Sequence, residues 1–211
     1  MQLIEHLVGP DDCVWDVGAH HGYVTLVAAR RVRSPRQVHA FEPSPLNQRM
    51  LLRHLQWNDL GGVRAHRLAL SDFEGVARFG GDGSSQTFAL DRGADLVEVS
   101  SGAQIISTGL APAPTFLKVD VEGAEVAVLR GLVDVLPGAV RMLIAMHSRQ
   151  AVEECRVLLE PRGFRLIGTA DLHRALASSF GSDPDLLALG PECPELSEQT
   201  IGIGELVALM E

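Results

Sequence analysis

Basic side chains are scarce in this 211-residue chain, and their scarcity excludes one class of partner. Eighteen lysines and arginines stand against 27 aspartates and glutamates, which gives a net charge of −9. Because nucleic-acid binding depends on an excess of basic side chains, we expect no general nucleic-acid surface. One local basic run falls at the end of a predicted helix, where cations suit the helix dipole, so a solvated face is favoured over a polyanion site. This run comprises Arg30, Arg31, Arg33 and Arg36.

Long apolar runs and a cysteine framework are absent as well. No apolar run reaches the length that spans a bilayer, and residues 1–6 have neither a basic leader nor the apolar core of a signal peptide. The three cysteines, Cys13, Cys155 and Cys193, are odd in number and have no metal-like spacing. They are therefore expected to be free thiols in a reducing compartment. These features favour a cytoplasmic protein without a membrane partner.

Lysine is nearly missing: Lys118 is the only lysine, and the other seventeen basic side chains are arginines. This bias indicates that position 118 requires a compact ammonium and not a planar guanidinium. Lys118 lies in an apolar strand predicted at 116–121, with Asp120 and Glu122 at i+2 and i+4, so all three project from one face while the backbone is extended. Because unpaired buried charges are costly, they are predicted to form an active-site floor, with a lone structural ion pair as the alternative.

The alternation of apolar segments predicts an α/β fold. Strands are expected at 13–17, 37–41, 63–70, 116–121, 140–146, 164–167 and 186–189, with helices between them after Gly22 and at 45–57, 124–136, 152–159 and 172–177. This is the βαβ pattern of a parallel sheet with right-handed crossovers. We expect a single Rossmann-like, doubly wound sheet of about seven mostly parallel strands with helices on both faces. The length suits one such domain over residues 1–211.

Three segments lie outside this alternation. A short amphipathic helix is predicted over residues 2–9, before the first strand. Residues 73–115 are rich in glycine and serine and hold only short β-like pieces, so they are expected to form a β-rich insertion or a lid. The C-terminal tail, 191–211, is acidic and polar up to a predicted docking helix at 201–210.

Chemically active side chains gather at the predicted carboxyl ends of the strands. They are Asp16, Glu42, Ser71, Asp72, Asp120, Glu122 and His147. In a doubly wound sheet, ligands bind at this edge, near the point where the strand order reverses. The coincidence across five strands predicts a ligand site there.

The loop after the first strand indicates the kind of cofactor. Gly18 and Gly22 form Gly-x-x-x-Gly, not the Gly-x-Gly-x-x-Gly of dinucleotide-binding folds. Asp16 precedes this loop, where its charge repels a pyrophosphate and attracts a ligand with an ammonium and a sulfonium, the charge pattern of S-adenosylmethionine. Glu42 has two acceptor oxygens for the ribose hydroxyls. The alternative is that both acids are simply solvated strand ends.

The end of the third predicted strand is ambiguous. Ser71 and Asp72 are placed to reach the adenine edge of such a cofactor, but a plain turn fits the sequence equally well.

Five motifs in order across residues 11–170 resemble those of the FkbM family of class I S-adenosylmethionine-dependent methyltransferases. The motifs are Val14–Tyr23, Ala40–Pro45, Ala69–Gly75, Leu117–Glu125 and Leu129–Gly131. The Lys-x-Asp-x-Glu-Gly-x-Glu block is the distinctive one, and His20 stands where the family usually has asparagine. The resemblance implies a seven-stranded sheet with an antiparallel last pairing, and methyl transfer to a hydroxyl oxygen, often on a sugar or polyketide-type product. It also implies further cofactor contacts from Ala19, His20, Gly22, Pro43 and Asp120.

A hydroxyl acceptor is a poor nucleophile at neutral pH, so a base or a cation must lie near its oxygen. His147 is the predicted base, because the ordinary pKa of histidine lies near neutrality. Asp120 is predicted to contact the cofactor ammonium or to orient the base, and Lys118 to stabilise a developing alkoxide or to neutralise Asp120. Glu122 is predicted to take part in catalysis, with a first-turn helix acid as the alternative. Asp120, Glu122 and His147 also form a Mg²⁺ ligand set, which is not favoured, so no metal is assigned.

Two other function classes are compatible with the sequence: an NAD(P)-dependent Rossmann oxidoreductase, and a cofactor-binding partner protein without turnover. Comparing the binding of S-adenosylhomocysteine with the binding of NAD distinguishes an oxidoreductase from a methyltransferase. The expected partner of a methyltransferase is a small-molecule hydroxyl acceptor, and the chain is compatible with a monomer or a dimer.

Overall fold

The structure, a computed structural model, describes residues 2–80, 89–90, 95–168 and 185–193. Its elements in chain order are α1 (Gln2–Leu7), β1 (Val14–Val17), α2 (Tyr23–Arg31), η1 (Pro35–Gln37), β2 (Val38–Phe41), α3 (Pro45–Trp57), β3 (Arg64–His66), β4 (Ala69–Ser71), β5 (Gly75–Gly80), β6 (Ala89–Leu90), β7 (Asp95–Ser101), α4 (Gly102–Ser107), β8 (Phe116–Val119), α5 (Glu125–Arg130), η2 (Val133–Val135), β9 (Arg141–Ala145), α6 (Arg149–Leu159), η3 (Glu160–Arg162), β10 (Arg165–Gly168) and β11 (Asp185–Leu189).

A seven-stranded sheet forms the centre of the fold, in the order β10-β11-β9-β8-β1-β2-β3. Strands β9, β8, β1, β2 and β3 pair in parallel, and β11 runs antiparallel to both β9 and β10. The predicted fold class is confirmed, including the antiparallel pairing at the end of the chain. The strand order reverses between β1 and β8, which is the position where such sheets bind ligands.

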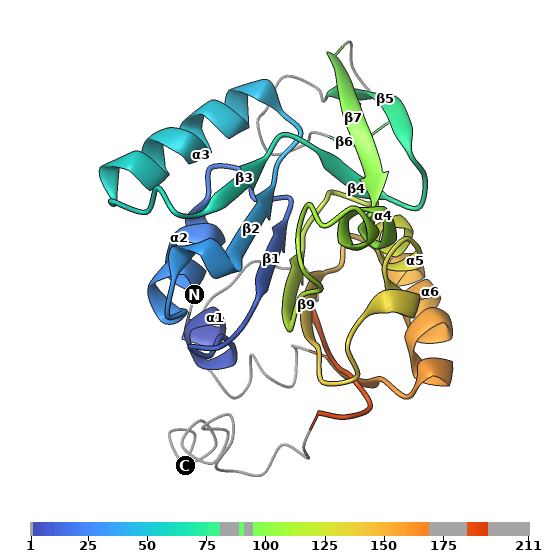
Figure 1. Ribbon diagram of the computed structural model, residues 1–211. Coiled ribbons are helices and arrows are strands. Elements are labelled where there is room, and N and C mark those ends of the chain that lie inside the picture. The colour runs from blue at the N-terminus through green and yellow to red at the C-terminus, as the bar shows by residue number, and fades with distance from the viewer. Residues whose placement is uncertain (1, 81–88, 91–94, 169–184, 194–211) are drawn as a thin grey trace.

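Successive residues of each strand pack on opposite faces of this sheet. Val14 of β1 belongs to a core shared with α1, α2 and α3, whereas its neighbour Trp15 belongs to a core shared with α5 and α6. Phe116 and Leu117 of β8 divide between the two cores in the same way. Figure 1 shows α1, α2 and α3 on one side of the strands and α4, α5 and α6 on the other. The period-2 alternation of strand side chains therefore accounts for helices on both faces.

The start of α3 has an N-cap and a proline at its first position. Ser44 is the N-cap, and its side chain accepts a hydrogen bond from the backbone N–H of Asn47. Pro45 occupies the first helical position, where its missing N–H costs nothing. This start confirms the expected boundary and places Ser44 two residues after Glu42, a predicted site residue.

The strand predicted at 63–70 is in fact two strands in two sheets. β3 pairs with β2 in the main sheet, whereas β4 pairs with β7 in a second sheet. The single-strand prediction was wrong because only Arg67 and Leu68 separate the two pieces. A break this short leaves the apolar pattern almost continuous, although the chain changes partner.

The second sheet has the order β4-β7-β5-β6, and residues 73–115 supply β5, β6, β7 and α4. A small core holds it together, formed by Ala69, Ala77, Phe79, Val97 and Val99. Figure 1 shows this sheet beyond the ends of β2 and β3. The segment predicted to be an insertion or lid therefore lies next to the edge that carries the site.

The helix predicted at 124–136 is shorter than expected: α5 ends at Arg130, and η2 follows. A Cβ atom on Gly131, the C-cap of α5, would lie 2.0 Å from the backbone oxygen of Ser71. The close approach of β4 thus requires glycine at the helix end. The predicted helices at 172–177 and 201–210, and most of the tail 191–211, fall outside the described residues. Among the helices that are described, none is both long and apolar enough to cross a bilayer.

A pair of histidines, His39 buried and His66 half-buried, joins β2 and β3. His39 Nδ1 lies 3.2 Å from His66 Nε2. Burial, together with His66 and Arg64, lowers the pKa of His39 from 6.5 to about 4, and burial together with Arg64 lowers the pKa of His66. The unfolded chain therefore takes up protons near pH 6.5 while the folded chain does not, so the free energy of unfolding is expected to fall as the pH decreases from 6.5 toward 4.

Urea denaturation across this pH range checks the expectation. In His39→Phe the pH dependence should be shallower, because one of the two depressed groups is gone. A slope equal to that of the wild type would show that the pair does not govern acid stability.

Candidate active site

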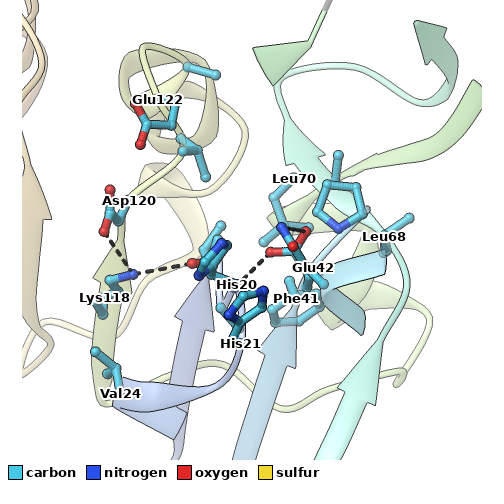
Figure 2. Close-up of a pocket in the computed structure, with 18 of the residues that line it drawn as sticks. His20, His21, Val24, Phe41, Glu42, Leu68, Leu70, Lys118, Asp120 and Glu122 are labelled. Atoms are coloured by element: carbon cyan, nitrogen blue, oxygen red, sulfur yellow. Dashed lines mark hydrogen bonds and ion pairs between the residues drawn. The ribbon is translucent and has the colours of Figure 1, made fainter. Parts of the chain in front are cut away.

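A cavity of about 440 Å³ opens at the carboxyl edge of β1, β2 and β8, where the strand order reverses. Its volume falls in the range of about 300–1,000 Å³ that small-molecule sites occupy. Residues from three loops and from the second sheet line it, among them Gly18, Ala19, His20, His21, Phe41, Glu42, Pro43, Leu68, Leu70, Phe79, Lys118, Asp120 and Glu122. Figure 2 shows many of these side chains converging. Six of the ten residues predicted to bind cofactor are in this lining: Gly18, Ala19, His20, Glu42, Pro43 and Asp120.

Gly18 ties the loops after β1, β2 and β8 together. Its φ is +78°, and a Cβ atom here would lie 1.8 Å from the backbone oxygen of Asp120. The N–H groups of Gly18 and Ala19 both donate to the Phe41 carbonyl at 3.0 Å. Only glycine satisfies this close approach, because any side chain would displace the β8 loop.

Gly22, another predicted cofactor contact, is not among the cavity-lining residues. It is the N-cap of α2 with φ +87°, and a Cβ atom here would lie 2.3 Å from Leu51 Cδ1. Gly22 therefore allows α2 to pack closely against α3.

Gly22→Ala is expected to lower the free energy of unfolding by about 1–3 kcal/mol, because alanine must adopt a left-handed backbone and displace Leu51. Gly61→Ala is the matched control, since a Cβ atom there meets nothing within 4 Å. Urea denaturation measures both, and equal stability of the two variants would contradict the assignment.

His20 and His21 form part of the cavity wall, with their rings stacked at a centroid distance of 3.9 Å. His20 has φ +52°, a left-handed backbone that places its N–H on Glu42 Oε2. Burial and the neighbouring His20 lower the pKa of His21. His20 thus faces the cavity, and its contact with a cofactor stays a prediction.

Asp16 is fully buried and is not among the cavity-lining residues. Its Oδ2 accepts a hydrogen bond of 2.5 Å from the Thr25 hydroxyl, and its Oδ1 lies 3.5 Å from Lys118 Nζ. These contacts enclose the carboxylate, so the predicted direct contact with the cofactor has no geometric support. Asp16 instead positions Lys118, its parallel partner in the register of β1 and β8.

The Lys118 ammonium has three oxygen partners. Nζ lies 3.5 Å from Asp16, 3.2 Å from Asp120, and donates to the Gly18 carbonyl at 3.3 Å. Burial alone lowers the pKa of Lys118, but the carboxylates of Asp16 and Asp120 outweigh burial and raise it. The amine therefore stays charged and holds the loops after β1 and β8 together (Figure 2).

Glu42 presents a buried carboxylate in the cavity wall. Its Oε2 accepts from the His20 N–H at 2.7 Å, and its Oε1 accepts from the Ser44 N–H at 2.9 Å and the Asn47 amide at 3.5 Å. Burial raises the pKa of Glu42, and these donors oppose the rise. Because an ionised carboxylate has about four acceptor positions, one is left for a ligand.

Ser71 and Asp72 do not line the cavity. The Ser71 side chain is buried at the end of β4 and donates to Asp72 at 3.4 Å. Leu68 and Leu70, which the sequence did not single out, form the wall instead. The predicted contact of Ser71 and Asp72 with an adenine ring therefore has no support in this geometry. The missed signal is apolar: a cofactor ring needs hydrophobic surface as well as polar partners.

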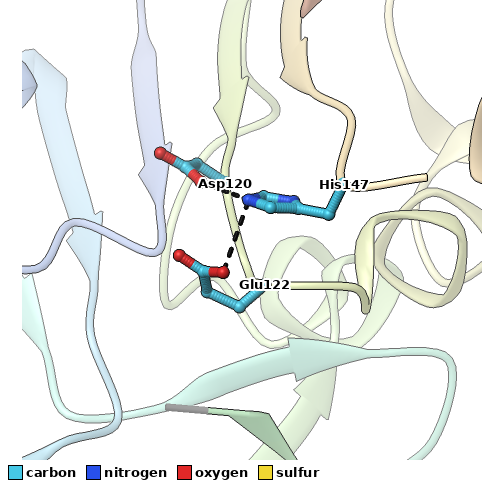
Figure 3. Close-up of side chains that lie close together, drawn as sticks. All are labelled: Asp120, Glu122 and His147. Atoms are coloured by element: carbon cyan, nitrogen blue, oxygen red, sulfur yellow. Dashed lines mark ion pairs between the residues drawn. The ribbon is translucent and has the colours of Figure 1, made fainter. Parts of the chain in front are cut away.

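Asp120 and Glu122 leave the strand rather than extend it. β8 ends at Val119, and Glu122 has a left-handed backbone with φ +54°. The prediction that the three charges project from one face of an extended strand was therefore wrong. Both carboxylates nevertheless line the cavity and lie 3.6 Å and 3.5 Å from His147 Nε2 (Figure 3). Glu122 precedes α5, so its alternative role as a first-turn helix acid is wrong.

Glu125 holds the other side of the His147 ring. Its Oε1 lies 2.8 Å from Nδ1 and accepts from the Gly123 N–H at 2.9 Å. Burial lowers the pKa of His147, but Glu125, Glu122 and Asp120 together raise it. Glu125 is fully buried and was not predicted as a site residue. Its signal was present as the last acid of the Lys-x-Asp-x-Glu-Gly-x-Glu block.

The doubly wound sheet with a cavity at its switch point is a Rossmann-like fold. Residues 16–166 match the methyltransferase FkbM domain, and the chain belongs to this family.

Two curated relatives are methyltransferases by name. The hexuronic acid methyltransferase AglP of Haloferax volcanii is 28% identical over 143 residues, which cover 65% of this chain and 57% of that protein. Methyltransferase 1 of Beauveria bassiana is 28% identical over 183 residues, which cover 74% of this chain and 73% of that protein. The chain thus spans little more than half the length of AglP.

Solved structures share the fold. An FkbM methyltransferase from Methylobacillus flagellatus superimposes with a TM-score of 0.60 at 18% identity, over 85% of this chain and 44% of that one. An O-methyltransferase from Bacillus cereus in complex with SAH superimposes with a TM-score of 0.53 at 14% identity, over 90% and 78%. At these identities the likeness shows the fold alone.

Proposed function

We propose that this protein transfers the methyl group of S-adenosylmethionine to a hydroxyl oxygen of a small molecule, such as a sugar or a polyketide-type product. The single observation that carries the proposal is the charge of the cavity at the switch point: Glu42 and Asp120 both line it. Carboxylates attract a donor that carries an ammonium and a sulfonium, and they repel the pyrophosphate of a dinucleotide.

The cavity offers a complementary surface for each part of the donor. Glu42 has an acceptor position left for the ribose hydroxyls, and the apolar wall of Phe41, Leu68 and Leu70 suits the adenine. Asp120, whose side chain is 40% exposed, is the proposed partner of the cofactor ammonium. Since Lys118 already has three oxygen partners, we assign it to positioning Asp120 rather than to stabilising an alkoxide.

Methyl transfer is an in-line displacement at the methyl carbon. The acceptor oxygen forms a bond to the methyl group while the methyl–sulfur bond breaks, and the electron pair stays on sulfur to give S-adenosylhomocysteine. The hydroxyl proton must leave, and we assign activation of the hydroxyl to the cluster of Asp120, Glu122 and His147. The cluster suits this role because Asp120 and Glu122 line the cavity, and His147, which is not among the lining residues, lies behind them and is held by Glu125.

The charge of this edge also bears on the acceptor. Without a bound cation, Asp120 and Glu122 disfavour an anionic group close to the transferred methyl, so a neutral hydroxyl is preferred over a carboxylate. The name of AglP supports sugars as the first class to test, with neutral sugars ahead of uronic acids.

Calorimetry and a turnover assay together test the proposal. S-adenosylhomocysteine is expected to bind and NAD is not, and S-adenosylhomocysteine should form from the donor when neutral sugars or polyketide-type alcohols are added. Tight NAD binding with no response to S-adenosylhomocysteine would favour an oxidoreductase. Binding of S-adenosylhomocysteine without turnover across these acceptors would favour a non-catalytic partner protein.

A further inference from the structure

The geometry points to a divalent cation site formed by Asp120, Glu122 and His147. We infer that these side chains bind a first-row transition ion, with Mn²⁺ or Zn²⁺ preferred over Mg²⁺ and Ca²⁺. Ion binding is inferred from the contacts described below. Only the role of the ion in methyl transfer rests on the proposed function.

The spacing of the three side chains matches a coordination shell. One ligand atom from each lies within 4.8 Å of the others, and His147 Nε2 is 3.6 Å from Asp120 and 3.5 Å from Glu122. Two ligands at about 2.1 Å from an ion are about 3.4 Å apart when the angle is tetrahedral. The observed separations therefore leave room for an ion between the side chains with only small adjustments (Figure 3).

A second observation comes from Glu125, which is outside the ligand set. Its carboxylate is fully buried and directed at His147 Nδ1, and its Oε2 has no hydrogen-bond partner among the residues that the structure describes. An ionised carboxylate only accepts hydrogen bonds, so it places the imidazole proton on Nδ1. In the neutral ring, the form that binds a cation, the lone pair of Nε2 then faces Asp120 and Glu122. Metal-ligating histidines are oriented by carboxylates in this way.

The balance of charge points in the same direction. Three carboxylates, those of Asp16, Asp120 and Glu125, share two basic groups, Lys118 and His147, even before Glu122 is counted. Asp16 and Glu125 are fully buried, so water screens them poorly. A divalent cation at the His147 end would supply positive charge where the carboxylates are in excess.

The donor set selects the kind of ion. One imidazole nitrogen and two carboxylate oxygens suit Mn²⁺ or Zn²⁺ better than Mg²⁺ or Ca²⁺, which favour oxygen alone. Asp120 and Glu122 line the cavity, so a ligand in the cavity could reach an ion held by them. A hydroxyl bound there has a lowered pKa. Its proton passes to solvent water as the oxygen–methyl bond forms and the methyl–sulfur bond breaks.

The test is a Mn²⁺ titration of the metal-stripped chain, followed by the EPR signal of free Mn²⁺, with Zn²⁺ as competitor. The wild type is expected to bind one ion per chain. Glu122→Gln and His147→Gln should bind about tenfold more weakly or worse, and Glu125→Gln about 10- to 100-fold more weakly. Glu153→Gln, an exposed acid on α6, is the matched control and should bind as the wild type does.

Calorimetry with S-adenosylhomocysteine on the same variants shows that the cofactor cavity is intact. The inference is overturned if neither Mn²⁺ nor Zn²⁺ binds at millimolar concentration, or if the ligand variants bind like Glu153→Gln. In that case His147 is an imidazolium paired with its carboxylates. Retained S-adenosylhomocysteine binding and turnover in chelator would then leave the proposed function standing, whereas ion binding without S-adenosylhomocysteine binding would support the ion site alone.

Discussion

Lys118→Met is expected to lower the free energy of unfolding by about 3–5 kcal/mol, the usual cost of removing one partner of a buried ion pair. The substitution leaves Asp16 fully buried, with the Thr25 hydroxyl as its hydrogen-bond donor among the described residues, and it frees the Gly18 carbonyl and Asp120 from their common partner. The loss arises mainly from the uncompensated carboxylate and not from missing apolar contacts.

Urea denaturation measures this effect, with Arg33→Gln as the control. Arg33 forms an ion pair with Asp11 in which both side chains are exposed, so its removal should change stability little. The double variant Asp16→Asn, Lys118→Met should recover part of the loss, because the charge without a partner is gone. A double variant as unstable as the sum of the two single variants would contradict the assignment to charge pairing.

Glu42→Gln is expected to weaken S-adenosylhomocysteine binding by about 10- to 100-fold, since one hydrogen bond to a charged acceptor contributes about 1.5–3 kcal/mol. The glutamine N–H₂ group also replaces one of the two carboxylate oxygens that accept from the backbone, so either the His20 N–H or the Ser44 N–H faces another donor. The wall of the cavity would therefore lose both charge and preorganisation.

Calorimetry checks this result, with Glu98→Gln on the exposed face of β7 as the control. The control should bind S-adenosylhomocysteine like the wild type. Unchanged affinity in Glu42→Gln would remove Glu42 from the proposed ribose site, whatever the stability of the variant.

The central strands of the main sheet were predictable because they are short buried runs with helices on either side. Trp15 and Leu117 pack on one face while Val14 and Phe116 pack on the other, and this alternation sets the layers. The split of the segment 63–70 was not predictable, because the local pattern does not say which partner a strand will meet. That choice is made by β7, some thirty residues later in the chain.

The sequence predicted the charged residues of the site better than the buried residues that hold them in place. Asp120 and His147 follow adjacent parallel strands, so their meeting could be expected from topology alone. The enclosure of Asp16 by Thr25 depends on the packing of α2, which no motif encodes. Glu125 was missed because a buried acid in the first turn of a helix has the same sequence pattern as an exposed one.

The single lysine has a practical consequence. Its ε-amine is largely buried and has a raised pKa, so amine-directed labels and cross-linkers should leave the side chain of Lys118 untouched in the folded protein. Any acylation found at this position by mass spectrometry would then report transient separation of the β1 and β8 loops. One natural residue thus serves as a built-in reporter for local opening, without any engineered tag.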